Sequence, residues 1–191
     1  MILYHGTSIA AWENINKHGI LADLNKETEL DFGFGFYVSR KEDIGYAKAH
    51  AKKVAKDAFG RTNLYRNAVV VKMELDETLI DSKLEFQNKD NDFIDFIFNT
   101  RMNYKNENLQ FDVIVGPMAD GAVDYAMSIY RKFPCRLVKC LVKLNYMLPF
   151  NNHRQMVIKN QALCNSIQVK EVKNLRGEVL YEQKKEDTSH S

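Results

Sequence analysis

The sequence predicts a single α+β domain in which short strands and helices follow one another irregularly. Apolar residues make up 45% of the 191 residues and charged residues 27%, as in ordinary folded domains. Apolar positions recur with a period of two in some segments and with helical spacing in others. Because the two kinds do not alternate regularly, we do not expect a doubly wound parallel sheet. Since no repeat or low-complexity linker divides the chain, we expect one domain over 1–178 and a polar, flexible tail over 179–191.

The N-terminal elements are predicted from cap and turn residues. A short apolar strand over 2–4 ends at Gly6, and Ser8 can cap a helix over 9–19. Polar residues and glycines dominate 22–35, which indicates a loop.

Apolar periodicity predicts the remaining elements. The clearest strand covers 68–75, because Val69, Val71 and Met73 share one face while Lys72 points to the other. The other predicted strands are 36–38, 111–115, 156–158 and 167–172, and the other predicted helices are 43–59, 92–102, 122–130 and 136–144.

Charge and cysteine content exclude several classes of protein. A formal net charge of +2 does not predict nucleic-acid or membrane binding by the whole chain. The three cysteines include no CxxC pair, so neither a disulfide framework nor a zinc ribbon is expected, and a reducing cytoplasm fits best. We expect no export signal, no membrane-spanning segment and no metal site.

Two short motifs carry the functional signal: LYHGTS at 3–8 and DFGFGFYVS at 31–39. Together they resemble the first two motifs of the ADP-ribosyltransferase superfamily, in the His-Tyr-Glu branch that includes diphtheria toxin and the poly-ADP-ribose polymerases. With FDVIVGPMAD at 111–120, they look closest to an uncharacterised bacterial family within that superfamily. The resemblance implies a split mixed sheet with flanking helices, and NAD as the co-substrate.

The resemblance also implies a role for individual residues. His5 would hydrogen-bond a ribose hydroxyl, Gly6 would hold the nicotinamide carboxamide through its backbone, and Tyr37 would stack on the nicotinamide ring. The rings of His5 and Tyr37 are thus expected to close around the same leaving group. Tyr46 would supply the opposing aromatic face, although its spacing differs from the polymerase pattern by a couple of residues. The remaining members of the implied NAD-binding set are Thr7, Gly35 and Ser39.

The third motif decides whether such a protein is a working enzyme. The best match is RQMVIK at 154–159, which places Gln155 where the catalytic glutamate stands in the polymerases. A glutamine keeps an acceptor oxygen but has no charge and no useful basicity, a loss on the order of 1–2 kcal/mol in the transition state. Either the acceptor is then already nucleophilic, or another carboxylate serves as the general base, for which Asp31 and Asp120 are the candidates. If the alignment is shifted, Gln155 is instead an ordinary exposed strand residue.

A basic segment follows the second motif. Residues 40–61 contain seven basic and three acidic side chains, a local net charge of +4. This segment suits a pyrophosphate or a nucleic-acid backbone, and it equally suits a solvated helix face.

These observations lead us to expect an NAD-dependent mono-ADP-ribosyltransferase of the bacterial toxin or defence type. It would modify a macromolecule in the cytoplasm and be restrained by an antitoxin-like partner, as relatives of this compact build often are. The glutamine at 155 and the basic segment favour an RNA or DNA base over a protein side chain as the acceptor. The alternatives are a catalytically silent NAD- or nucleotide-binding regulatory module and an NAD glycohydrolase.

Overall fold

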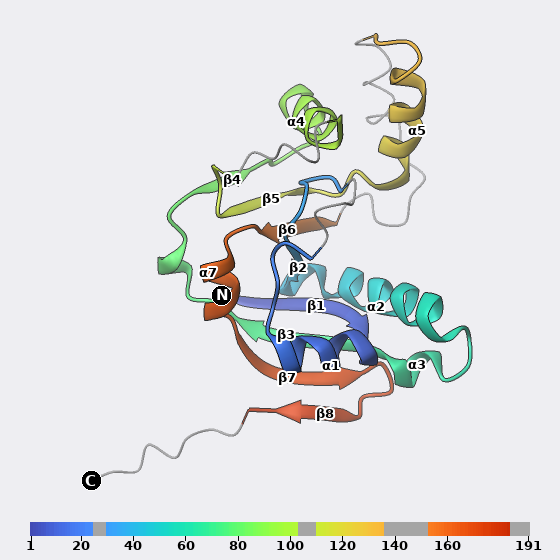
Figure 1. Ribbon diagram of the computed structural model, residues 1–191, viewed down its shortest axis with the longest axis vertical. Coiled ribbons are helices and arrows are strands. Elements are labelled where there is room, and N and C mark those ends of the chain that lie inside the picture. Colours follow the sequence, from blue (N-terminus) through green and yellow to red (C-terminus); the bar gives the residue numbers. More distant parts are fainter. Residues whose placement is uncertain (25–29, 103–109, 136–152, 184–191) are drawn as a thin grey trace.

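A mixed sheet forms the centre of the protein in the computed structural model, which describes residues 1–24, 30–102, 110–135 and 153–183, except for the side chains of 120–122. The strand order within these residues is β4-β5-β6-β2-β1-β3-β7-β8 (Figure 1). Only β4 and β5 pair in parallel among the described strands. The strands are β1 (Ile2–Ser8), β2 (Phe36–Arg40), β3 (Ala68–Glu74), β4 (Lys83–Glu85), β5 (Val113–Pro117), β6 (Arg154–Ile158), β7 (Gln168–Asn174) and β8 (Val179–Glu182).

Helices cover both faces of this sheet (Figure 1). The described helices are α1 (Ile9–His18), α2 (Ile44–Phe59), α3 (Leu64–Asn67), α4 (Asn91–Met102), α5 (Asp120–Tyr130) and α7 (Gln161–Ser166), with 3-10 turns at Lys41–Asp43 and Glu77–Leu79. The helix expected at 136–144 lies outside the described residues. None of the helices in the described ranges is long and apolar enough to cross a membrane.

Alternation along the strands divides the core into two sides. Val69, Val71 and Met73 of β3 are buried with Trp12 of α1, as the period of two predicts. On the opposite face, Ala68 packs against the alanine stripe of α2. In the β4-β5-β6-β2 half of the sheet, Ile114 and Val157 pack beneath apolar residues of α4 and α5. The α+β class of the chain is therefore confirmed.

The sheet is weakly joined at its centre. Strands β1 and β2 pair only at Leu3↔Arg40 and Tyr4↔Ser39. Beyond Tyr4, β1 continues along β3 as far as Ser8, while β2 continues along β6 through Tyr37 and Phe36. The two halves of the sheet part at this point, and the space between them holds the candidate site.

The first strand is longer than expected. It does not end at Gly6, which pairs with Val70 in the middle of the β1–β3 ladder. A Cβ added at Gly6 would lie 1.7 Å from the carbonyl oxygen of Ala47. This glycine therefore allows the α2 backbone to approach β1 closely, a use of glycine different from ending a strand.

The start of the predicted tail is also ordered. Val179–Glu182 form β8, which pairs with β7 at the edge of the sheet. Asn174 stabilises the connecting turn, since its side-chain Oδ1 accepts from the backbone N–H groups of Arg176 and Glu178 at 3.0 Å each. The prediction of a flexible tail from residue 179 is therefore wrong for these four strand residues, while 184–191 lie outside the described part of the chain.

Candidate functional site

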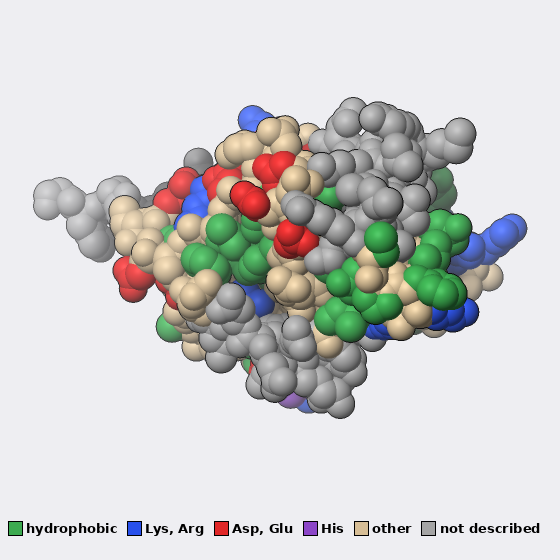
Figure 2. Space-filling model, turned by 90° about the horizontal axis from the view of Figure 1, so that it is seen from above, with side chains coloured by type: hydrophobic (Ala, Val, Ile, Leu, Met, Phe, Trp, Pro, Cys, Tyr) green, Lys and Arg blue, Asp and Glu red, His purple; other side chains and the backbone are tan. Residues whose placement is uncertain are grey.

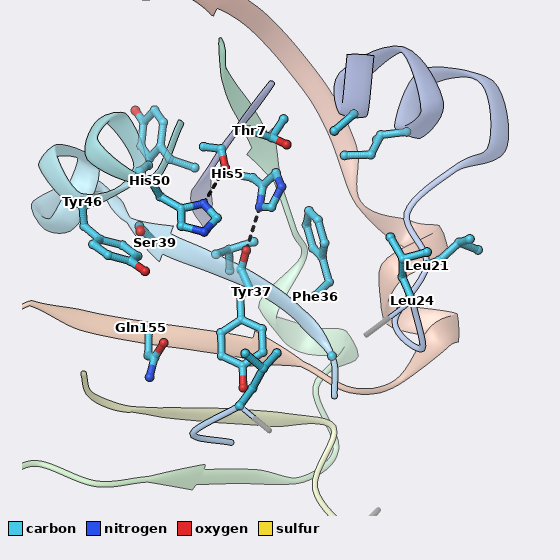
Figure 3. Close-up of a pocket in the computed structure, with 18 of the residues that line it drawn as sticks. His5, Thr7, Leu21, Leu24, Phe36, Tyr37, Ser39, Tyr46, His50 and Gln155 are labelled. Atoms are coloured by element: carbon cyan, nitrogen blue, oxygen red, sulfur yellow. Dashed lines mark hydrogen bonds between the residues drawn. The ribbon is translucent and has the colours of Figure 1, made fainter. Parts of the chain in front are cut away.

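A cavity of about 610 Å³ opens where β1 and β2 part (Figure 3). Its volume lies in the range typical of pockets for small molecules and cofactors. Residues of β1, β2, α1, α2, β6 and the loop before β2 line it. The structure places every residue of the sequence-based site set on this wall, from three separate parts of the chain: His5, Gly6, Thr7, Gly35, Tyr37, Ser39, Tyr46 and Gln155.

His5 bridges the gap between the two parting strands. Its Nδ1 lies 2.8 Å from the carbonyl oxygen of Tyr37. Because a carbonyl can only accept, Nδ1 carries the hydrogen and Nε2 is left as an acceptor. Burial, with a smaller contribution from nearby His50, lowers the pKa of His5 to about 4 against the raising effect of the Tyr37 carbonyl. His5 is therefore neutral at pH 7 and suited to accept a hydrogen bond from a hydroxyl group.

The ring of Tyr37 is fixed by the glycine loop. Its hydroxyl donates to the carbonyl oxygen of Gly33 at 2.7 Å and accepts from the backbone N–H of Phe32 at 3.0 Å. This loop is anchored in turn, since buried Lys159 donates to the Phe32 carbonyl oxygen at 2.8 Å. Gly35 has a φ of +146°, and a Cβ there would lie 2.2 Å from Cγ2 of Val157, so its backbone conformation and its packing both call for glycine.

His5 and Tyr37 do not enclose the same ring, contrary to the sequence-based expectation. The imidazole packs against Phe36, with 4.6 Å between the ring centroids. Because neighbouring strand residues point to opposite faces, the ring of Tyr37 lies on the other side of β2 from that of Phe36 (Figure 3). The two side chains share one cavity but line different parts of it.

Helix α2 contributes a row of side chains to the cavity. Tyr46, His50 and Lys53 all line it, at the i, i+4 and i+7 spacing that places residues on one helix face. His50 donates from Nδ1 to the Gly6 carbonyl oxygen at 2.9 Å, and its ring centroid lies 5.9 Å from that of Tyr46. His50 was not among the site residues expected from the sequence. Its position four residues after Tyr46, on the same face of the predicted helix, could have identified it as a site residue.

Gln155 is buried, with 6% of its surface exposed, so the alternative of an exposed strand residue is wrong. In Figure 3 its amide lies beside the ring of Tyr37 and below that of Tyr46. Nε2 of the amide donates to Oδ2 of Asp31 at 2.9 Å. The acceptor atom of the amide, Oε1, therefore points away from Asp31.

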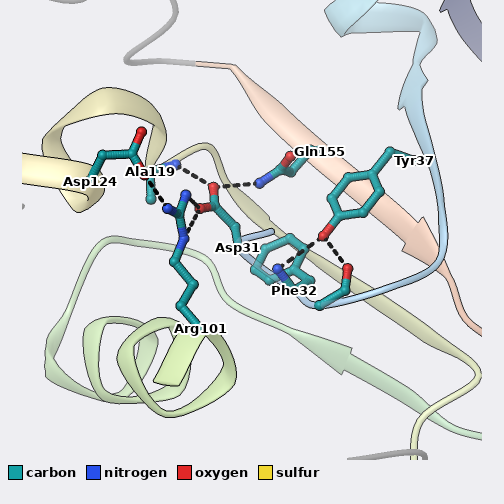
Figure 4. Close-up of polar contacts among 8 residues, drawn as sticks. Asp31, Phe32, Tyr37, Arg101, Ala119, Asp124 and Gln155 are labelled. Carbon is teal, nitrogen blue, oxygen red and sulfur yellow. Dashed lines mark hydrogen bonds and ion pairs between the residues drawn. The ribbon is translucent and has the colours of Figure 1, made fainter. Parts of the chain in front are cut away.

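Asp31 is the centre of a buried polar network (Figure 4). Its Oδ1 accepts from Nε of Arg101 at 3.1 Å and also from Nη2, and its Oδ2 accepts from the backbone N–H of Ala119 at 3.1 Å. Burial tends to lower the pKa of Arg101, but the carboxylates of Asp31 and Asp124 outweigh it and raise that pKa. Together with the bond from Gln155, these contacts engage both carboxylate oxygens, so Asp31 has no open acceptor position for the proton of a nucleophile and does not suit the role of general base. The side chain of Asp120 lies outside the described ones.

The basic segment contributes little to the cavity directly. Among its described basic residues, Lys53 lines the wall, whereas Lys52 lies over the ring of Tyr65, 4.9 Å from the centroid, and Arg40 faces Glu85 at 4.0 Å. The end of the molecule that carries α4 and α5 shows acidic and hydrophobic side chains near its centre, with Lys and Arg mainly at its edges (Figure 2). The exposed basic side chains of α2 are Lys48, Lys53 and Lys56.

The arrangement defines a class of site: a cofactor-sized cavity in a parted sheet, with aromatic rings that include Tyr37 and Tyr46, a neutral imidazole acceptor and a buried amide. Among the described residues, no three side chains of His, Cys, Asp or Glu are grouped so that they could hold a metal ion. The chain belongs to the family described as "Protein of unknown function (DUF3990)", whose family model matches residues 1–169. No curated protein matches the chain, and no solved structure does.

Proposed function

We propose that this protein is an NAD-dependent mono-ADP-ribosyltransferase with an ADP-ribosyltransferase-like fold. The observation that carries the proposal is the convergence on one cavity of the His5–Thr7 segment, the Gly35–Ser39 segment and Gln155. These three segments are the ones that resemble the three motifs of the superfamily, and up to about 150 residues separate them in the sequence. The parting of β1 and β2 supports the proposal, because it gives both faces of the sheet access to one cavity.

The geometry suggests how NAD would lie. The nicotinamide ring would sit between Tyr37 and Tyr46, beside the backbone of Gly6 on the α2 side of the sheet. His5, on the other side of β2, would accept a hydrogen bond from a ribose hydroxyl through Nε2. This placement assigns His5 and Tyr37 to different parts of one dinucleotide, in agreement with their separation by β2.

The reaction would transfer ADP-ribose from nicotinamide to a nucleophile. The bond between nicotinamide nitrogen and ribose C1′ breaks, its electron pair leaves with nicotinamide, and the ribose becomes oxocarbenium-like before the nucleophile bonds to C1′. The protein's task is to orient the dinucleotide and stabilise the developing charge. Gln155 would orient the ribose by accepting a hydrogen bond from a hydroxyl group at Oε1.

A base of RNA or DNA is the proposed acceptor. A ring or exocyclic nitrogen of a nucleobase can attack before it loses its proton, so it depends less on a general base than an alcohol does. Asp31, the carboxylate among the described residues of the cavity wall, is committed to Arg101 and other donors. The exposed lysines of α2 would attract a polyanion towards the cavity. We further propose that the protein acts in the cytoplasm as a toxin or defence effector restrained by a partner protein.

Incubation of the purified protein with NAD labelled in its adenylate part tests this function. Label on RNA or DNA supports the proposal. Label on protein would show that the acceptor is a protein side chain and not a nucleic-acid base. Release of free ADP-ribose would indicate a glycohydrolase, and intact NAD with measurable binding would indicate a silent NAD-binding module. If the protein neither binds nor consumes NAD, the proposed function is wrong. Val172→Ala, at a buried residue of β7 that does not line the cavity, controls for general loss of packing.

A further inference from the structure

The network beside Gln155 uses all the acceptor positions of Asp31. Oδ1 accepts twice from Arg101, through Nε and Nη2, and Oδ2 accepts from Nε2 of Gln155 and the backbone N–H of Ala119 (Figure 4). A carboxylate offers about four acceptor positions, so the network is complete. Only a hydrogen-bond donor fits at the end of residue 155 that faces Asp31. The amide nitrogen of Gln155 must therefore point to Asp31, and Oε1 must point away from it.

The charge balance of the network also selects an amide. Arg101 is paired with Asp31 and, through Nη1, with Asp124, so one guanidinium faces two carboxylates. Asp31 and Arg101 are both buried, whereas Asp124 is largely exposed. A glutamate at position 155 would place a third carboxylate within about 3 Å of Asp31, a distance at which two like charges resist simultaneous ionisation. Glutamine has nearly the same shape and avoids this repulsion.

We propose that Asp31 is the positioning residue of the site: it holds the Gln155 amide with Oε1 towards the cavity as a neutral acceptor for a substrate hydroxyl. This inference rests on the proposed function for its reference to substrate, but the orientation of the amide follows from the contacts alone. Glutamine at this position is then the residue the network requires. Converting it to the glutamate that stands in the polymerases impairs the site instead of improving it.

The test compares the thermal unfolding of wild type and Q155E at pH 8 and pH 5. At pH 8 the new carboxylate faces Asp31, and we expect Q155E to melt roughly 5 °C below wild type, as for a repulsion of a few kcal/mol in a chain of this size. At pH 5 the new carboxyl takes up a proton, and its O–H replaces the Nε2–H donor to Asp31. The difference in melting temperature between Q155E and wild type should then shrink by at least half. An unchanged or larger deficit at pH 5 contradicts the proposal.

Two further variants isolate the interaction. In D31N/Q155E the repulsion is absent, so the deficit relative to D31N should be the same at both pH values. Q87E makes the same substitution at an exposed position and should show no deficit at pH 8. The other titratable groups around Asp31 and residue 155 are the same in wild type and Q155E, so their contributions to the pH dependence of the melting temperature largely cancel in the comparison. These groups are Arg101, Asp124, Tyr37, His5, His50, Tyr46 and Lys53.

NAD turnover separates this inference from the proposed function. Assayed at a temperature at which both proteins stay folded at both pH values, Q155E should lose at least about tenfold in kcat at pH 8, with partial recovery relative to wild type as the pH falls. A loss of folded protein would not give this response at that temperature. Turnover by Q155E equal to or above wild type at pH 8 overturns the positioning role. If the melting pattern is as expected but wild type neither binds nor consumes NAD, the Asp31–Gln155 arrangement stands and the proposed function fails.

Discussion

The neutral state of the half-buried His5 predicts a loss of stability in acid. The pKa of His5 is lowered from 6.5 to about 4, mainly by burial. Between these values the unfolded chain binds a proton at His5 and the folded protein does not, so the free energy of unfolding falls as the pH decreases from about 6.5 to 4. The upper limit of this loss, for a shift of about 2.5 pH units, is about 3.4 kcal/mol.

The perturbation is His5→Asn, which removes the titration while keeping a side-chain N–H near the Nδ1 position that donates to the Tyr37 carbonyl oxygen. Between pH 7 and pH 4.5, wild type should lose about 2.5 kcal/mol more stability than the variant, because the folded-state proton is taken up only near pH 4. The loss should be progressive and should continue to the acid end of this range.

Urea unfolding at a series of pH values measures this difference. NMR titration of the His5 ring provides a second, direct measurement of its protonation in the folded state. Equal acid dependence of stability in the two proteins, together with protonation of the folded His5 near pH 6.5, would refute the inference that the surroundings of His5 keep it neutral in acid.

Three other substitutions test the site. Gly6→Ala places a Cβ 1.7 Å from the Ala47 carbonyl oxygen, so a loss of more than about 3 kcal/mol or failure to fold is expected by circular dichroism, and near-wild-type stability would contradict the packing. Tyr37→Phe removes two hydrogen bonds to the glycine loop and should cost about 1–3 kcal/mol in urea unfolding. Tyr46→Ala should weaken NAD binding about tenfold by calorimetry with little change in melting temperature, and unchanged affinity would remove Tyr46 from the site.

Local patterns in the sequence were sufficient for several elements. Ser8 caps α1 by accepting from the N–H of Ala11 at 3.3 Å, and Gly19 ends the helix with a φ of 80°. Both signals act within a few residues, so they can be recognised without knowledge of the rest of the chain. The alternation of β3 is equally local, because each strand residue reports directly on the face it occupies.

Elements that depend on distant partners were not predicted. β4 is three residues long and is defined by parallel pairing with β5, from Lys83↔Val113 to Glu85↔Val115. β8 depends on antiparallel pairing with β7. Helix α7 was not predicted either, although its N-cap is a local signal: the side chain of Asn160 accepts from the N–H groups of Ala162 and Leu163.

The amino-acid sequence by itself determined the class of fold and the short motifs from which the site residues were chosen, because periodicity, caps and motif spacing are written in neighbouring residues. Only the tertiary structure decided which parts of the cavity His5 and Tyr37 occupy, since that depends on where β1 leaves β2 and on the side of the strand each residue faces. It also decided the orientation of Gln155, through Asp31 and Arg101, which lie 124 and 54 residues away in the chain. Hydrogen bonds and ion pairs act over a few ångströms in space, whatever the separation in sequence, and for this reason such a network emerges only when the sheet and its helices are assembled.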